Sequence, residues 1–246
     1  MRLTRVHVEG PLTGESQQII RGAAVNHISR VLRLRVGDNL TLFDGRGGEH
    51  EARIDEFRKD TVLVTVADHR PVEREAPVPI TLTQGISRGE RMDWVVQKAT
   101  ELGVARIVPV ITERCVVRLD AKQSEAKLRH WRAITIAACE QCGRNRVPEL
   151  EPVAKFYDYL RIAKAAGAMH RRLLLSPTGQ HRIRDLNGTV DAVSVLIGPE
   201  GGLTEVEHDS AIAAGFTAVR LGPRVLRTET AAVAALTAIQ QQLGDL

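Results

Sequence analysis

The chain has 246 residues, of which 43% are hydrophobic and only 3% aromatic, so it can build a sizeable and largely aliphatic core. The net charge is +4 and the sequence pI is about 9.2, which argues against an acidic, disordered chain. No apolar run is long enough for a membrane span, and the first residues lack the apolar stretch of a signal peptide; we therefore expect a cytoplasmic protein.

Arginine supplies most of the 34 basic residues. Its planar guanidinium suits bidentate contacts to phosphate better than lysine does. The composition therefore favours a polyanionic partner such as RNA, although an Arg-rich proteome would give the same composition.

The first 70 residues indicate a small β-rich unit. Leu3 to Val8 alternates between apolar and polar residues, whereas Val25 to Leu34 carries apolar residues at helical spacing. A glycine-rich turn at residues 44–48 joins two strands into a hairpin. Short strands at close spacing favour a small barrel. The expected strands are Leu40 to Phe43, Glu51 to Phe57 and Thr61 to Val66.

The stretch Arg70 to Pro79 has the composition of a linker. It contains three prolines among alternating charges, and such stretches are typical of domain boundaries. We therefore predict two domains, residues 1–72 and residues 73–246.

After the linker, strands alternate with helices, which predicts an α/β fold with a mostly parallel sheet. The expected strands are Ile80 to Gln84, Arg106 to Val110, Leu173 to Leu175, Val193 to Ile197 and Ala218 to Leu221. The expected helices are Glu90 to Leu102, Ser124 to Cys142, Phe156 to Ala166, Thr204 to about Gly215, and Thr228 to the end of the chain.

Three of these strands end in short loops rich in glycine and proline, at residues 176–179, 198–202 and 222–224. In an open α/β sheet a ligand binds outside the carboxyl ends of the strands, so we expect the three loops to share one pocket. None of them matches the dinucleotide or P-loop fingerprint. On spacing alone, purely structural turns fit equally well.

Cys139 and Cys142 form a C-x-x-C pair that invites a metal or redox interpretation. The pair lies inside a helical pattern with no second pair and no strand before it. Buried helix thiols are the better interpretation, and we expect no metal site.

The two C-terminal segments IGPEGGLT (197–204) and LGPRVLRTETA (221–231) resemble the signature of the RsmE family. This family consists of 16S ribosomal RNA uridine-N3 methyltransferases of the SPOUT superfamily. Residues 27–54, 91–104 and 140–150 resemble the family as well and occur in the expected order. The resemblance therefore runs along nearly the whole chain.

The resemblance implies a PUA-like, RNA-binding β-barrel followed by a SPOUT methyltransferase domain with a trefoil knot. It implies S-adenosylmethionine as cofactor, 16S rRNA within the small ribosomal subunit as substrate, and a homodimer in which a second subunit completes the site. The last helix offers a smooth alanine face for such a dimer, formed by Ala231, Ala232, Ala234, Ala235 and Ala238.

The knot loops of the family hold the cofactor, and by resemblance the three strand-end loops do so here. Aliphatic side chains would line the slot, and glycine backbone groups would bond the edges of the cofactor. The residues expected in the cofactor site are Leu175, Thr178, Ile197, Gly198, Pro199, Gly201, Gly202, Leu221, Gly222, Val225 and Leu226.

Methylation of uridine N3 requires loss of the N3 proton. Glu200 and Glu229 are the candidate bases, and Arg227 is placed to stabilise an enolate-like oxygen on the uracil. Glu229 also suits the first turn of a helix, and Glu200 could serve only to organise its loop.

Basic side chains on the barrel, and at the ends of strands and helices, are the expected RNA contacts, because they neutralise phosphate charge. They are Arg5, His27, Arg30, Arg33, Arg88, Lys98, Arg114 and Arg144. A solvated charged surface would have the same composition.

Three other functions remain open at this stage. One is a different SPOUT RNA methyltransferase, acting on a ribose 2′-O or on guanosine. The second is a non-enzymatic RNA-binding protein, which leaves the three loops without a purpose. The third is a nucleotide-binding α/β enzyme, against which the missing fingerprints count.

Overall fold

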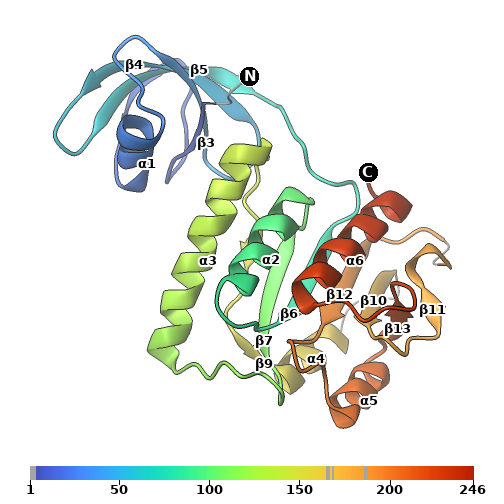
Figure 1. Ribbon diagram of the computed structural model, residues 1–246. Helices are drawn as coiled ribbons and strands as arrows, with labels where there is room; N and C mark the ends of the chain where they lie inside the picture. The colour runs from blue at the N-terminus through green and yellow to red at the C-terminus, as the bar shows by residue number, and fades with distance from the viewer. Residues whose placement is uncertain (1–3, 165–166, 168, 186–187) are drawn as a thin grey trace. The chain divides into compact units, whose positions relative to one another are not determined.

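The computed structural model describes residues 4–164, 167, 169–185 and 188–246. Two expected strand and helix ends, Leu3 and Ala166, lie outside these residues. The chain divides into two units. The first runs to Glu75 and also contains Ile136–Val147, and the second contains Ala76–Thr135 and Pro148–Leu246. Figure 1 shows the elements of both units.

The first unit is built on a five-stranded sheet in the order β1-β3-β4-β5-β2. Only β1 and β3 pair in parallel. Inward-facing aliphatic residues that alternate along the strands form its core, among them Leu42, Ile54 and Val64. The strands are β1 (Arg5–His7), β2 (Ser16–Ile20), β3 (Asn39–Phe43), β4 (Glu49–Phe57) and β5 (Val62–Arg70).

The expected helical segment from Val25 to Leu34 is not one regular helix. A short helix α1 (Ala23–Asn26) passes into a π-helical turn η1 (His27–Val31). Leu32 donates its backbone N–H to the carbonyl of His27 at 2.9 Å, and Arg33, just after the turn, has a φ of 57°. The apolar spacing did locate the buried side chain, because Ile28 is fully buried.

The second unit contains an eight-stranded sheet whose main path runs β11-β13-β10-β12-β6-β7-β8, with β9 also paired to β7. Every pairing in it is parallel, as the alternation of strands and helices predicted. The strands are β6 (Ile80–Gly85), β7 (Arg106–Ile111), β8 (Glu149–Leu150), β9 (Ala154–Lys155), β10 (His170–Leu175), β11 (His181–Arg182), β12 (Ala192–Ile197) and β13 (Thr217–Arg220).

Helices cover both faces of this sheet. Along each strand, successive residues point to opposite faces, so Leu173 packs with one set of helices and Leu174 with another. Helices α2 and α6 lie side by side over the first face, and α4 and α5 contact each other on the second (Figure 1). The helices are α2 (Glu90–Glu101), α3 (Ala121–Cys142), α4 (Phe156–Lys164), α5 (Glu205–Ala213), α6 (Thr228–Leu243) and the 3-10 turn η2 (Ile183–Asp185).

The alanine face expected to support a dimer is used differently. Ala231, Ala232 and Ala235 are buried within the core of the second unit, together with Leu236 and Ile239. The small side chains let α6 approach α2 and the sheet closely. Within the described residues, no helix is both long and apolar enough to cross a membrane.

Candidate functional site

The three glycine- and proline-containing loops meet at one cavity of about 590 Å³, as their positions at strand ends predicted. Loops after β10, β12 and β13 and the first turn of α6 form its walls. Of the expected cofactor residues, Thr178 lies outside the lining, where its hydroxyl contacts that of Ser176 at 3.1 Å. The others that line it are Leu175, Ile197, Gly198, Pro199, Gly201, Gly202, Leu221, Gly222, Val225 and Leu226.

Gly198, Gly201 and Gly202 of the 198–202 loop each require glycine for a different structural reason. A Cβ on Gly198 would lie 3.0 Å from the backbone of Gly202, and a Cβ on Gly201 would lie 3.0 Å from Arg114. Gly202 has a φ of 68°, which side chains other than glycine rarely adopt, and the space around its Cβ position is open. The loop is therefore folded tightly on itself at one end and open at the other.

Charged side chains from neighbouring elements hold this loop. Arg114 donates from Nη1 to the carbonyls of Gly201 and Leu203, at 3.2 and 3.3 Å. Glu207 is 1% exposed; it forms the expected capping box with Thr204 and also accepts the backbone N–H of Glu113 at 2.8 Å.

Glu200 fastens the middle of the loop to the start of α2. Its Oε1 accepts the backbone N–H of Arg88 and a hydrogen bond from Arg91, both at 2.9 Å. Burial by itself would raise the pKa of Glu200, but these hydrogen bonds and the charge of Arg91 outweigh it and lower that pKa. Glu200 is therefore held as a carboxylate.

Arg91 also approaches the other acidic residue of the cavity. Its Nε lies 3.8 Å from Oε1 of Glu229, in the first turn of α6. The second oxygen of Glu229, Oε2, is buried and has no hydrogen-bond partner within the described part of the chain. This oxygen is an acceptor that a bound donor would satisfy.

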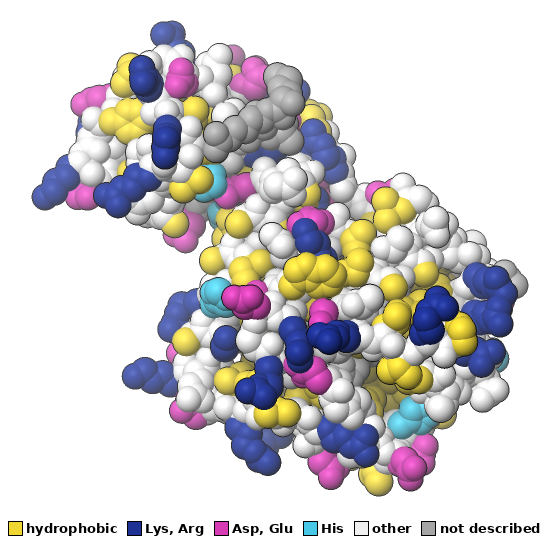
Figure 2. Space-filling model, in the orientation of Figure 1, with side chains coloured by type: hydrophobic (Ala, Val, Ile, Leu, Met, Phe, Trp, Pro, Cys, Tyr) yellow, Lys and Arg dark blue, Asp and Glu magenta, His cyan; other side chains and the backbone are white. Residues whose placement is uncertain are grey.

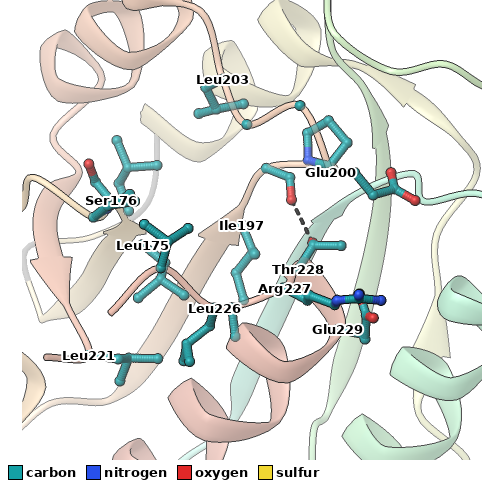
Figure 3. A pocket seen from close by; sticks show the side chains of 18 of the residues that line it. Leu175, Ser176, Ile197, Glu200, Leu203, Leu221, Leu226, Arg227, Thr228 and Glu229 are labelled. Carbon is teal, nitrogen blue, oxygen red and sulfur yellow. Dashed lines mark hydrogen bonds between the residues drawn. The ribbon is translucent and has the colours of Figure 1, made fainter. Parts of the chain in front are cut away.

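Apolar and charged side chains occupy different sides of the cavity (Figure 3). Leu175, Ile197, Leu221 and Leu226 gather on one side, and the charged residues Glu200, Arg227 and Glu229 lie on the other. The apolar side suits a flat, weakly polar ligand such as an adenosine moiety.

The residues fit S-adenosylmethionine. The volume lies within the range of small-molecule sites, roughly 300–1,000 Å³. Open space above Gly202 and Gly222 lets a ligand reach the backbone, because a Cβ at either position would meet nothing within 4 Å.

Nine lining residues were not named individually as site residues: Arg91, Leu174, Ser176, Pro177, Leu203, His208, Arg224, Thr228 and Ala231. Arg91 comes from α2, far along the chain from the loops, so no local pattern pointed to it. Ser176, Pro177 and Arg224 lie in the loops that were predicted to share the pocket, and Leu203 directly follows one of these loops. His208 lies inside α5, where a single histidine carries no sequence signal.

Two expected RNA contacts are buried in the first unit, and this corrects their interpretation. Arg5 is 3% exposed and donates to Glu49 at 2.5 Å and to Asn145 at 2.6 Å. Arg144 is also 3% exposed and is paired with Glu75. Burial and internal ion pairs make both arginines structural residues rather than phosphate contacts.

Three more expected RNA contacts are engaged by neighbours. The Nδ1 of His27 lies 3.6 Å from Glu140, and Lys98 donates to both oxygens of Glu101. Arg114 holds the 198–202 loop. By contrast the side chains of Arg30, Arg33 and Arg88 are exposed, and no carboxylate forms an ion pair with these side chains within the described residues. On the face shown in Figure 2, basic and acidic side chains are interspersed.

The C-x-x-C pair has no features of a reactive or metal-binding site. Burial raises the pKa of the Cys139 thiol to about 12, which disfavours the thiolate that metals and electrophiles require. Across the described ranges, no group of three or more His, Cys, Asp or Glu side chains is placed to hold a metal.

Most of the chain matches known protein families. Residues 74–240 match the model of the RNA methyltransferase domain, and residues 20–67 match the RNA methyltransferase PUA domain. The chain is 32% identical to ribosomal RNA small subunit methyltransferase E of Buchnera aphidicola, over 100% of this chain and 98% of that protein. It is 33% identical to the Bacillus subtilis protein of the same name, over 91% and 89%.

Two solved structures are similar over their full lengths. A methyltransferase from Legionella pneumophila, in complex with the bound cofactor SAM, is 41% identical with a TM-score of 0.94. A ribosomal RNA small subunit methyltransferase E from Neisseria gonorrhoeae, bound to S-adenosylmethionine, is 38% identical with a TM-score of 0.91. Each covers 100% of this chain and of its own.

Proposed function

The chain belongs to the RsmE family of ribosomal RNA methyltransferases, and we propose that it methylates N3 of one uridine in 16S rRNA, with S-adenosylmethionine as donor. One observation carries the proposal. The three strand-end loops converge on a single cavity, in a chain similar over its full length to proteins solved with this cofactor.

Bound S-adenosylmethionine supplies an activated methyl group on a positively charged sulfur. The chain contributes binding, orientation and exclusion of water. Leu175, Ile197, Leu221 and Leu226 surround the apolar part of the slot. The backbone at Gly202 and Gly222 is open to the ligand on the other walls.

The acceptor nitrogen must lose its proton before or during transfer. We assign Arg227 to the uracil oxygen on which negative charge develops, because its exposed side chain lines the cavity. Glu229 offers an unpaired oxygen to the N3 proton, whereas Glu200 is occupied by Arg88 and Arg91. We therefore favour Glu229 over Glu200 as the base.

The RNA-binding surface in this proposal includes Arg30 and Arg33 of the first unit and Arg88 beside the cavity. All three side chains are exposed, and none of them forms an ion pair with a carboxylate in the described part of the chain. Arg30 and Arg33 lie in the PUA-domain match.

Several wider predictions are also part of the proposal. The RsmE resemblance gives a homodimer, action on the small ribosomal subunit and a trefoil knot, and the composition of the chain gives a cytoplasmic location and a domain boundary after residue 72. The packing of residues 176–179 on β13 supports the knot. Ser176 donates its backbone N–H to the carbonyl of Val219 at 2.9 Å, and a Cβ on Gly179 would lie 2.6 Å from the Val219 backbone.

The test uses the chemical consequence of the product. A methyl on N3 blocks the Watson–Crick edge of uridine, so reverse transcriptase stops there. A strain lacking the protein should lose one strong stop in 16S rRNA and the matching N3-methyluridine in mass spectrometry, and the wild-type gene should restore both. A knockout that keeps every stop and the same N3-methyluridine content would refute the proposed product.

The same experiment separates the alternative reactions. A ribose 2′-O-methyl leaves the pairing edge intact and pauses the enzyme mainly at low nucleotide concentration. A methylated guanosine would appear as a different nucleoside in the mass spectrum.

A further inference from the structure

A chain of hydrogen bonds at the wall of the cavity joins three elements. The Thr228 hydroxyl, at the start of α6, donates to the carbonyl of Gly198 at 2.7 Å (Figure 3). Gln84, near the end of β6, donates from Nε2 to the same hydroxyl at 2.9 Å and approaches the Gly198 carbonyl at 3.4 Å. A single Thr hydroxyl thus ties the 198–202 loop to the helix that follows the 222–227 loop.

These groups are shielded from water, which makes the connection hard to replace. Gln84 is 0% exposed and Thr228 is 7% exposed. Water cannot take over a hydrogen bond lost at such a position, so the remaining donor or acceptor stays unpaired unless the backbone moves. Loss of the hydroxyl should therefore shift a loop and not merely weaken a contact.

The 222–227 loop has little else to fix its position. Within the described part of the chain, residues 222–226 form no hydrogen bond. The loop is anchored where it enters α6, and Thr228 is the first residue of that helix. By contrast, the 198–202 loop has separate anchors in Arg114 and Glu200.

The Thr228 hydroxyl does not perform the usual local task of a threonine at a helix start. Arg227 is the N-cap residue of α6, and no side-chain hydrogen bond caps that helix. In α5, Thr204 does cap its own helix, through the N–H of Glu207. The hydroxyl of Thr228 instead points across to the neighbouring loop.

We propose that Thr228 is a positioning residue that sets the separation of the two glycine loops, and with it the affinity of the cavity for S-adenosylmethionine. This inference rests on the proposed function, because it takes that molecule as the ligand. Thr228 lines the cavity, and in this proposal its hydroxyl acts through the Gly198 carbonyl and the start of α6.

The experiment compares Thr228→Val, which removes the hydroxyl at nearly constant shape, with Thr228→Ser, which keeps it. Calorimetry with the full chain should show that Thr228→Val raises the Kd for S-adenosylmethionine about tenfold. The Kd of Thr228→Ser should stay within about threefold of the wild-type value. In Thr228→Val the Kd for S-adenosylhomocysteine should rise by the same factor, because loop spacing does not depend on the charge of the sulfur.

Thr100 provides a matched control for the loss of a buried hydroxyl. It is 0% exposed, donates to the Val96 carbonyl at 2.8 Å, and lies near the end of α2 opposite to Arg91. Thr100→Val should lower the melting temperature and leave the Kd unchanged. If Thr228→Val also lowers only the melting temperature, Thr228 is a purely structural residue and the inference is overturned.

Two further outcomes keep the tests separable. If wild type itself does not bind S-adenosylmethionine, the proposed function fails, and this inference fails with it. If Thr228→Val does not fold, Thr228→Ala removes the same hydroxyl, whereas Gln84→Met would leave the Thr228–Gly198 hydrogen bond in place. A wild-type Kd in a folded Thr228→Ala protein would then overturn the inference, and a several-fold increase would support it.

Discussion

At the scale of single residues, the cofactor slot depends on the backbone at Gly202. Its φ of 68° is costly for any other residue, and its Cβ position faces open space. Replacement by Val should therefore weaken S-adenosylmethionine binding by tenfold or more, because a branched side chain would fill the space that a ligand needs and would strain the loop. Calorimetry on the folded variant measures this.

Gly22 provides the control for strain alone. It has a φ of 69°, and a Cβ there would also meet nothing within 4 Å, but it lies in the first unit. Gly22→Val should cost similar stability and leave the Kd for S-adenosylmethionine at the wild-type value. Equal losses of affinity in the two variants would show that the effect at Gly202 is general destabilisation.

Arg227 is the residue assigned to charge that develops on the uracil. Removal of one such donor typically lowers the rate by about 100- to 1000-fold. Arg227→Ala should therefore restore the reverse-transcription stop poorly in a knockout strain, with cofactor affinity little changed. Arg184→Ala, at an exposed position paired with Asp185, should restore it fully. Restoration by Arg227→Ala at the wild-type rate would transfer the role to another group.

The sequence predicted some of the cavity residues and missed others, for a physical reason. Loop residues at strand ends were found because the carboxyl edge of a parallel sheet gathers them, whatever their distance in sequence. Arg91 and the Gln84–Thr228 contact were missed, because a hydrogen bond between distant elements leaves no local pattern. Arg5 and Arg144 were misinterpreted, because sequence does not show which arginines find a buried carboxylate.

At the scale of elements, two of the glutamates of strand β4 have very different environments. Glu49 is 5% exposed and receives hydrogen bonds from Arg5 and from Asn145, so it joins residues 136–147 to the sheet of the first unit. Glu49→Gln should destabilise the fold by about 3–5 kcal/mol, because it leaves a buried guanidinium without its counter-charge. Urea unfolding measures the change.

Glu51, two residues along the same strand, is the matched control. Its ion pair with Arg70 is exposed, so Glu51→Gln should cost about 0–1 kcal/mol. Similar losses at both positions would contradict the structural role assigned to the buried cluster.

The contribution of Glu49 should depend on pH with a defined sign. Burial alone would raise its pKa, but hydrogen bonds from Arg5 and Asn145 and the charges of Arg5 and Arg74 lower it below the usual 4.5. A depressed pKa stabilises the fold above the unfolded value and loses this effect as the pH falls through the folded value. The stability gap between wild type and Glu49→Gln should thus be constant near neutral pH and shrink below about pH 4.5.

Element types were predictable where periodicity was long and regular, as in α2, α3 and the central parallel strands. The segment from Val25 to Leu34 was not, because its apolar spacing identifies a buried face and cannot distinguish an α-helix from a π-helical turn. The short strands β8, β9 and β11 have two residues each, too few to show a period. The alanines of α6 indicate close packing, but not whether the partner is α2 or a second subunit.

At the scale of the whole molecule, RNA binding should weaken with salt, because arginine contacts release counterions from phosphate. Arg30→Ala with Arg33→Ala should lower the slope of log affinity against log salt by about 1.4 on single-stranded RNA, or about 0.7 per contact. Cofactor affinity should not change. Arg58→Ala, at an exposed arginine already paired with Glu56, should keep the wild-type slope. An unchanged slope in the double variant would remove both arginines from the RNA surface.

The proposed homodimer predicts twice the chain mass of 27.0 kDa in light scattering, at concentrations where the protein is active. Val225, at the cavity wall, is 79% exposed, and a second subunit would cover such an apolar side chain. Val225→Asp should therefore favour the monomer. An active wild-type protein with the monomer mass would rule out the dimer.

The first unit is discontinuous in sequence, and this limits how the gene can be divided. The chain passes between the units at 75/76, 135/136 and 147/148. A gene fragment that ends at codon 75 would encode every strand of the first sheet but omit Glu140 and Asn145. Arg5 would lose its Asn145 partner, and the His7 N–H would lose Glu140. The first unit therefore cannot be transplanted as one contiguous cassette. A fusion or exchange experiment must carry residues 136–147 as well, for instance by linking them to the fragment in a new chain order.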